Sequence, residues 1–395
     1  MGTTPDPDSG RGFSVPEKPY GVAVHGAGDV STQHVHAYLN NPHTKLVAIS
    51  SRKEESAKKL ADSYGLKDVK FYTDFRDVLD DPDVDIVSIC TPQQLHAQEV
   101  VLAAEARKHM LIEKPVAITL ESLHMMRDAV RRSGVKTVVS FVLRWNTVIQ
   151  NIKTLLSKDY FGKVFLVETD FQSHAWEPVP ERWEWVRKKD TGVSAFLVAG
   201  VHAIDMARWL AVTEPNRTAN IVQVVSYAGG YRRGKHLAPF IYPENPPTEA
   251  NENLVAMLPL EYDGLEIMLV KFDNGALGKI SANFDAIMPY NFGWELYGDK
   301  GTCKQNRVWS KQNPRQSDWI TLPGDTPGSA AVGAHPFQAE IDHLVDCIIN
   351  GRESHANLED AVNTHEAALA AIISREEGNK PIKLPLTLRR STDAS

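Results

Sequence analysis

Apolar and polar positions follow one repeating order through the first third of the chain: a short apolar run, a turn, and then an amphipathic stretch. Short runs that are apolar throughout are typical of parallel strands, because both faces of a parallel sheet are covered. We expect such strands at residues 20–25, 45–50, 86–90, 110–112 and 137–141. Helices are expected between them, including residues 54–64 and 120–132. The alternation predicts a doubly wound parallel sheet of the α/β class.

The pattern changes after Asn146. A helix to residue 157 is followed by longer strand-like runs at 164–171, 221–227, 265–272, 276–284 and 293–297. Helical patterns return at 201–210, 337–349 and 359–374. The runs predict an α+β domain with a largely antiparallel sheet. We therefore divide the chain into a flexible N-terminal arm (1–19), a Rossmann domain (20–141), an α+β domain (142–385) and a C-terminal tail (386–395).

Composition narrows the possible partners. The formal charge of −7, from 43 Lys and Arg against 50 Asp and Glu, offers no basic field for nucleic acid. Three well-separated cysteines, Cys90, Cys303 and Cys347, suggest neither a disulfide framework nor a thiolate metal site, so we expect a reducing compartment and no metal. Without a signal-peptide pattern or an apolar run of about 18 residues, we expect a cytoplasmic protein with no membrane contact.

A glycine turn directly follows the first predicted strand, and it reads Gly26-Ala27-Gly28-Asp29-Val30-Ser31. The turn is close to the dinucleotide fingerprint, with serine at the third glycine position. In that fingerprint the backbone approaches a pyrophosphate, and the next helix offers the anion its N-terminal amides. The alternative is a tight turn that binds no ligand.

The second predicted strand ends at Ser50 and leads into Ser51 and Arg52, where an NAD site usually has a carboxylate for the ribose hydroxyls. Arginine beside small hydroxyls suits the 2′-phosphate of NADP, which tilts the prediction toward NADP. Arg52 could equally be a solvated residue that opens the next helix, or stack on adenine while NAD is bound. The predicted cofactor is therefore NAD or NADP.

The fourth predicted strand ends before Thr91 and Pro92, which we expect to shape the crevice beneath the nicotinamide ribose. His96 follows four residues later. It either contacts the cofactor or caps the next helix.

Glu113-Lys114-Pro115 follows an apolar run and carries the strongest chemical signal in the chain. The carboxyl end of a buried parallel strand delivers Lys114 to the edge where such sheets bind ligands. Burial lowers a lysine pKa and a neighbouring carboxylate raises it, so the pair can tune a proton donor toward neutral pH. The tripeptide suggests a dehydrogenase, although an ordinary surface pair beside a turn is an equal alternative.

Together these motifs resemble the glucose-fructose oxidoreductase and inositol dehydrogenase family, Gfo/Idh/MocA, over residues 20–385. The resemblance continues through Arg144-Trp145-Asn146, Gly200-Val201-His202-Ala203-Ile204-Asp205, the hairpin at 294–302 and the tail at 378–385. It implies a nicotinamide cofactor held between a Rossmann domain and an open-faced, mostly antiparallel sheet. Such a sheet commonly supports homodimers or homotetramers.

The resemblance also implies roles for single residues. Lys114 is expected to transfer the substrate's hydroxyl proton with His202 as its partner, and Glu113, Lys114 and Arg144 are expected near the cofactor. Many family dehydrogenases have an aspartate four residues before the histidine, but this chain has Val198. Three explanations are open: Lys114 and His202 suffice for the proton transfer without an aspartate, a group such as Tyr290 or Asp205 assists His202, or the chemistry is not simple alcohol oxidation.

A second set of residues is predicted to line the substrate cleft. Arg187 and Lys189 belong to a cationic run after two tryptophans, which suits a sugar bearing a carboxylate, phosphate or sulfonate, although a solvated charge run is the alternative. Trp145, His174 and Tyr290 are further candidates, beside Lys114 and His202 themselves.

These observations predict an NAD(P)-dependent oxidoreductase that acts on a ring hydroxyl of a small sugar, glycoside or cyclitol. The alternative is an NAD-dependent glycosidase that oxidises C3, eliminates the aglycone, adds water and returns the hydride. A third possibility is a cofactor-binding sensor without catalysis, which the presence of both Lys114 and His202 argues against.

Overall fold

The computed structural model describes residues 18–173, 185–230, 260–286, 288, 290–325 and 335–388. The predicted N-terminal arm lies outside these ranges except for its last two residues, and so do the last seven residues of the predicted tail.

The N-terminal part forms a six-stranded parallel sheet in the order β3-β2-β1-β4-β5-β6. This order confirms the predicted doubly wound arrangement. The strands are β1 (Tyr20–His25), β2 (Thr44–Ser50), β3 (Lys70–Tyr72), β4 (Ile86–Ile89), β5 (His109–Ile112) and β6 (Thr137–Val139). All four residues of β4 and the last three of β5 are buried, as expected for strands covered on both faces.

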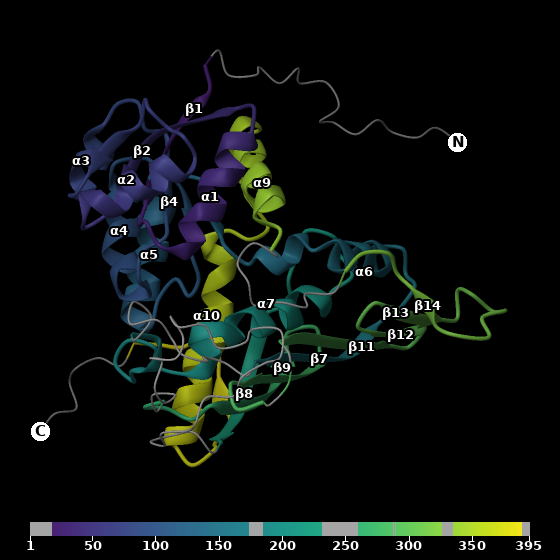
Figure 1. Ribbon diagram of the computed structural model, residues 1–395. Coiled ribbons are helices and arrows are strands. Elements are labelled where there is room, and N and C mark those ends of the chain that lie inside the picture. The colour runs from purple at the N-terminus through teal and green to yellow at the C-terminus, as the bar shows by residue number, and fades with distance from the viewer. Residues whose placement is uncertain are drawn as a thin grey trace, which may run out of the picture.

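Helices cover both faces of this sheet: α1 (Asp29–Asn40), α2 (Glu54–Ser63), α3 (Phe75–Asp80), α4 (Gln93–Glu105) and α5 (Leu120–Ser133). The helix α9 (Phe337–Ile349) returns from the C-terminal part of the chain and packs against α1. Its buried residues Ile341, Leu344 and Val345 belong to the same apolar cluster as Val22 and Val24 of β1. A helix from the end of the sequence therefore completes the N-terminal domain (Figure 1).

The second sheet has nine strands in the order β14-β13-β12-β11-β7-β10-β9-β8-β15. Its long strands are β7 (Val164–Gln172), β8 (Ile221–Gly229), β9 (Leu265–Phe272), β10 (Leu277–Asn283) and β11 (Asn291–Gly298). The shorter ones are β12 (Gly301–Lys304), β13 (Arg307–Ser310), β14 (Ile320–Thr321) and β15 (Ile382–Lys383). Every pair is antiparallel except β7 with β10, so the predicted largely antiparallel sheet is confirmed.

Helices pack on one side of the second sheet, as Figure 1 shows for α7. The chain leaves the first sheet through a 3₁₀ turn, η1 (Val142–Trp145), and α6 (Thr147–Ser157). A π-helical turn, η3 (Phe196–Gly200), leads into α7 (Val201–Leu210), and α10 (Leu358–Glu376) contacts both α5 and β8. Since α10 touches elements of both domains, it holds the two together. None of the helices in the described ranges combines the length and the apolar character needed to cross a membrane.

Candidate active site

Lys114 follows β5 at the carboxyl edge of the parallel sheet. Its ammonium nitrogen lies 3.5 Å from the carbonyl oxygen of Val198, so the side chain spans from the first domain to the second. Burial lowers the pKa of Lys114, and the nearby charge of Glu113 opposes this shift without cancelling it. The expected combination of a buried lysine and an adjacent carboxylate is therefore present.

His202 lies in the first turn of α7 and is 8% exposed. Gly200 allows this helix start to approach β10, because a Cβ there would be 2.8 Å from the Cβ of Ala282. Among the described residues the Nδ1 atom of His202 has no hydrogen-bond partner. Burial, followed by the positive charge of Lys114, lowers its pKa well below the ordinary value. With Val198 in place of a carboxylate, His202 is held as a neutral imidazole.

His335 is a site residue that the sequence analysis missed. It precedes α9, and its ring lies 6.3 Å from that of Phe337, which in turn lies 5.3 Å from the ring of His34. Burial and the charge of Lys114 lower its pKa to about 4. His335 also acts electrostatically on His202, so two neutral histidines lie near one lysine.

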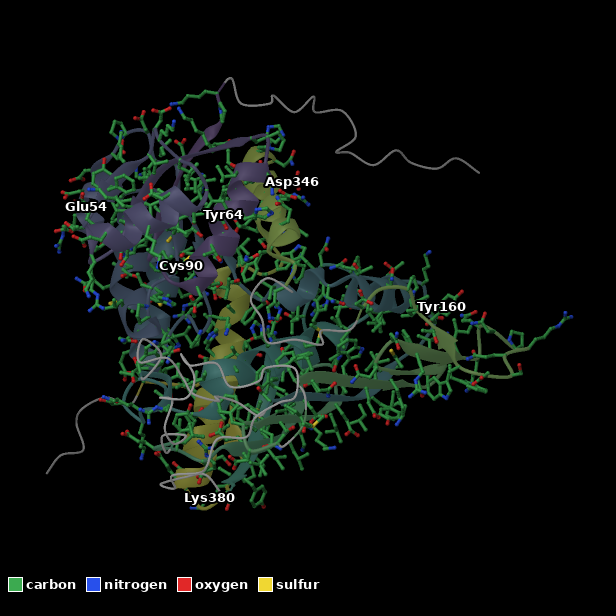
Figure 2. The ribbon with its side chains drawn as sticks, in the orientation of Figure 1. Glu54, Tyr64, Cys90, Tyr160, Asp346 and Lys380 are labelled. Atoms are coloured by element: carbon green, nitrogen blue, oxygen red, sulfur yellow. The ribbon has the colours of Figure 1, made fainter. Side chains whose placement is uncertain are left out.

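Glu113 is fixed by a buried network beneath Lys114. One carboxylate oxygen lies 3.1 Å from Nε2 of His34, and the other accepts the backbone N–H of Lys114 at 3.1 Å. Nδ1 of His34 faces the Ser88 hydroxyl at 2.6 Å and the Cys90 thiol at 3.3 Å. Burial alone would lower the pKa of His34, but Cys90 and Glu113 raise it to about 10. In Figure 2, Cys90 lies among the side chains that fill the N-terminal domain.

Glu340 on α9 adds a second carboxyl group to this network. It is fully buried and accepts a hydrogen bond from the Ser140 hydroxyl at 3.0 Å. Burial and then the charge of Glu113 raise its pKa well above the ordinary value. Glu340 is therefore a protonated acid while Glu113 is ionised.

We expect Glu340→Gln to stabilise the protein above pH 5. The folded state keeps a proton on Glu340 that the unfolded chain releases above its ordinary pKa of about 4.5, so wild-type stability falls as pH rises, by up to about 1.4 kcal/mol per pH unit. Glutamine keeps the shape without this loss. The melting temperatures of Glu340→Gln and the wild type, measured from pH 4 to 8, should diverge as the pH rises, whereas the exposed control Glu376→Gln should follow the wild type. If the difference in melting temperature between Glu340→Gln and the wild type did not change with pH, Glu340 would not stay protonated in the folded protein.

The glycine turn fits a dinucleotide. Gly26 has φ of 102°, in the left-handed region, and a Cβ there would lie 2.6 Å from the carbonyl oxygen of Cys90. Gly28 caps α1 without a side chain, and a Cβ there would meet nothing within 4 Å. The first amides of α1, beginning at Asp29 and Val30, can therefore face an anion. Ser31 is fully buried with its hydroxyl bonded to Gly28, so only its backbone can take part.

The other predicted cofactor residues lie at the same edge. Ser51 donates its backbone N–H to Tyr72, and the Arg52 side chain is exposed. Pro92 precedes α4, and the Thr91 hydroxyl donates to Glu99. His96 is buried with its ring nitrogens 3.0 Å from the Pro115 carbonyl and 2.8 Å from the Thr91 carbonyl. Since both nitrogens face protein groups, we propose that His96 braces the turns at Thr91 and Pro115 instead of contacting the cofactor.

Arg144 lies in η1, shortly after β6. It is fully buried, with its guanidinium bonded to Asp205, Asp360 and the carbonyl of His355. With those bonds made, we propose a structural role for Arg144 in place of the predicted cofactor contact, and Asp205 is likewise unavailable to His202. Neighbouring Trp145 packs against the rings of His343 and His355 and lines a separate hollow of about 450 Å³.

The remaining substrate candidates are dispersed. Arg187 is buried, whereas Lys189 is exposed and donates its backbone N–H to Glu261. The segment that carries them reaches the N-terminal domain, because the Gln93 amide donates to the carbonyl of Thr191. The ring of Tyr290 packs edge-on against that of Phe171, with ring centroids 5.5 Å apart. His174 lies outside the described residues.

Comparisons with known proteins assign both parts of the chain to one oxidoreductase family. The model described as "Oxidoreductase family, NAD-binding Rossmann fold" matches residues 20–141, and "Oxidoreductase family, C-terminal alpha/beta domain" matches residues 153–384. The chain is 30% identical over 282 residues to the uncharacterized oxidoreductase YrbE of Bacillus subtilis, covering 71% of this chain and 72% of the relative. It is 25% identical over 370 residues to the scyllo-inositol 2-dehydrogenase (NAD(+)) of Bacillus subtilis, and the match covers 92% of this chain and 95% of that relative.

Solved structures share the fold. A levoglucosan dehydrogenase in complex with NADH and levoglucosan superposes with a TM-score of 0.74 at 22% identity, covering 93% of this chain and 100% of that one. The chain belongs to the Gfo/Idh/MocA oxidoreductase family. Its N-terminal domain is the NAD-binding Rossmann domain of that family.

Proposed function

We propose that this protein is an NAD(P)-dependent oxidoreductase that transfers a hydride between nicotinamide and a ring hydroxyl of a sugar, glycoside or cyclitol. The observation that carries the proposal is the buried amine of Lys114 at the ligand edge of the Rossmann sheet, with a lowered pKa and with His202 and His335 nearby. The names of the relatives, scyllo-inositol 2-dehydrogenase and levoglucosan dehydrogenase, support a ring hydroxyl as the reacting group.

Lys114 and His202 have different roles in the proton transfer. The Lys114 amine, whose pKa is lowered by burial, accepts the hydroxyl proton of the substrate. His202 is already neutral and too weak a base to hold that proton near pH 7, so it orients the hydroxyl through a hydrogen bond. The turn at Gly26 and Gly28 and the first amides of α1 would hold the dinucleotide, whose nicotinamide would supply the hydride acceptor.

A second candidate, an NAD-dependent glycosidase, is favoured by Val198, because the absent carboxylate leaves His202 without a partner for Nδ1 among the described residues. Both functions use Lys114, but only the dehydrogenase changes the nicotinamide balance. Absorbance of reduced nicotinamide and release of aglycone should therefore be measured in parallel on neutral and anionic sugars and their glycosides.

The outcomes of this assay separate the candidates. Accumulation of NADH or NADPH without aglycone supports the dehydrogenase. Release of aglycone without net reduction identifies the glycosidase. A chain that binds cofactor but does neither across the panel would contradict the proposal and favour a sensor.

We propose that the protein is a homodimer or homotetramer in the cytoplasm and that the open face of the second sheet forms the subunit interface. Tyr227 of β8 pairs with Ile267 of β9, and Leu269 lies two residues further along β9 on the same face. Leu277 lies on the adjacent strand β10. These side chains are 59%, 38%, 57% and 50% exposed, respectively. Contiguous exposed apolar groups are typical of interfaces. Sedimentation of the full chain as a monomer at micromolar concentration would contradict this assembly.

A further inference from the structure

One buried carboxylate interrupts the apolar inner row of β9. Alternate residues of this strand are buried, and Met268, Val270 and Phe272 follow Glu266 in that row. Glu266 is 1% exposed, and burial raises its pKa against the opposing charge of Arg375. The Arg375 guanidinium of α10 donates to one oxygen of this carboxylate. Because a buried ion pair adds little net stability over apolar side chains of similar volume, the pair points to a role beyond packing.

The second oxygen of Glu266 binds the start of the helix that carries His202. This oxygen accepts the N–H of Phe196 at 2.8 Å. The Ser194 hydroxyl accepts the next N–H, that of Leu197, at 3.3 Å. The first N–H groups of a helix have no partner within the helix, and a negative charge suits the positive end of the helix dipole. Glu266 and Ser194 together therefore fix where this helix begins.

The helix begins with the π-helical turn η3, and this turn faces Lys114. The Val198 carbonyl, within η3, lies 3.5 Å from Lys114 Nζ, and His202 follows four residues later. A π turn holds more residues than an α turn, so a change to α geometry would rotate η3 about the helix axis by about 100° for each residue displaced. Gly200 makes the turn compact, because a Cβ there would lie 2.8 Å from Cδ1 of Phe196. The geometry of η3 therefore decides which group meets the lysine.

We propose that Glu266 is a positioning residue for the reaction, because its bond to the first N–H of η3 keeps this turn in the form that directs the Val198 carbonyl at Lys114. The inference rests on the proposed function, in which Lys114 accepts the proton of the substrate. Glu266 acts through position and not through its own charge, since burial and the charge of Glu113 set the pKa of Lys114. An amine held in one orientation reacts faster than one that must first be oriented.

Two double variants separate this role from packing. Arg375→Met with Glu266→Gln removes both charges and keeps an oxygen that can accept the Phe196 N–H, whereas Arg375→Met with Glu266→Met removes that oxygen as well. The test is the kcat of each full-length variant on the sugar or glycoside that the wild-type chain turns over fastest in the panel above. We expect kcat to stay near that of the wild type in the glutamine double variant. In the methionine double variant it should fall about 100-fold, the loss typical of a reacting group displaced by about 1 Å.

The dissociation constant of NAD+ or NADP+, whichever the wild-type chain binds more tightly, is measured in parallel by titration calorimetry. It should be the same in both double variants, because the glycine turn is untouched. Equal values of kcat in the two double variants would overturn the inference, since the oxygen at position 266 would then not matter. A parallel loss of cofactor affinity in the methionine double variant would overturn it too, because that result indicates a general disturbance of the fold.

If the methionine double variant does not fold, Glu266→Asp keeps the charge and withdraws the carboxylate by one methylene. Its kcat must fall while its affinity for the dinucleotide stays level, or the inference fails. A wild-type chain that turns over no member of the panel would refute the proposed function itself, and the positioning role would fall with it.

Discussion

Replacing Lys114 by methionine should give a protein that is nearly inactive and yet more stable than the wild type. The catalytic loss follows from the removal of the proton acceptor, and general base catalysis contributes about 10²–10⁴-fold to rate. Methionine fills a similar volume without a charge, so the fold and the cofactor crevice should remain. We expect kcat/KM to fall by about that factor while the affinity for the dinucleotide changes little.

The gain in stability follows from the pKa of Lys114. Burial lowers it in the folded state, so below the ordinary lysine pKa the unfolded chain binds a proton more readily, and wild-type stability falls as pH decreases. Because methionine does not titrate, the stability of Lys114→Met does not fall in this way as pH decreases. Its melting temperature should therefore exceed that of the wild type by a margin that grows as pH falls from the ordinary lysine pKa of about 10.4 to the lowered pKa of Lys114 and then stays constant. The exposed control Lys59→Met should show no such trend.

The pH dependence of the wild-type rate gives an independent check. Alcohol oxidation requires the neutral amine, so kcat/KM should rise with pH through the lowered pKa of Lys114 and then level off. Turnover by Lys114→Met close to that of the wild type would refute the role of Lys114 as proton acceptor. Unchanged biological activity in such a variant would favour the sensor.

Local patterns predicted the elements well where burial is uniform along a segment. The strand β1 and the helices α7 and α9 have the predicted bounds, because their apolar residues are contiguous or recur at the helical period. The three-residue strand β3 was missed, since Lys70, Phe71 and Tyr72 are only partly buried or exposed and form no apolar run. The parallel pairing of β10 with β7 also depends on long-range contacts that no local pattern encodes.

The candidate site was predictable only in part. Lys114 and the glycine turn follow buried strands, which fixes the edge of the sheet to which they belong. His34 and Glu113 are separated by 79 residues, and Ser140 and Glu340 by 200, so their contacts depend on how α1 and α9 pack. His335 lies in no periodic segment and gave no signal.

Arg144 shows how a motif can indicate importance and still mislead about function. The segment around it matches the family, but its cation neutralises carboxylates that come from α7 and α10. Burial alone would raise the pKa of Asp360, but Arg208 and Arg144 lower it below the usual range. The group forms a buried ion-pair cluster in which Asp205 depends on Arg144 and Asp360 is shared by both arginines.

Replacing Arg144 by methionine should therefore cost stability without a direct effect on cofactor binding. Removing one partner of a buried ion pair leaves an uncompensated charge and costs about 3–5 kcal/mol. For a chain of 395 residues this corresponds to a fall in melting temperature of about 4–6 °C. Scanning calorimetry measures the loss, and titration of the folded variant with NAD+ measures any change in affinity.

The double variant Arg144→Met with Asp205→Asn separates a charge effect from a packing effect. It removes one positive and one negative charge and leaves Asp360 paired with Arg208, 2.9 Å away. We expect it to recover about half or more of the lost stability, because contacting residues are energetically coupled. A double variant as unstable as the sum of the single changes would show that packing dominates. Weaker NAD+ binding in the folded Arg144→Met protein, at unchanged stability, would instead restore the cofactor role that its sequence motif predicts.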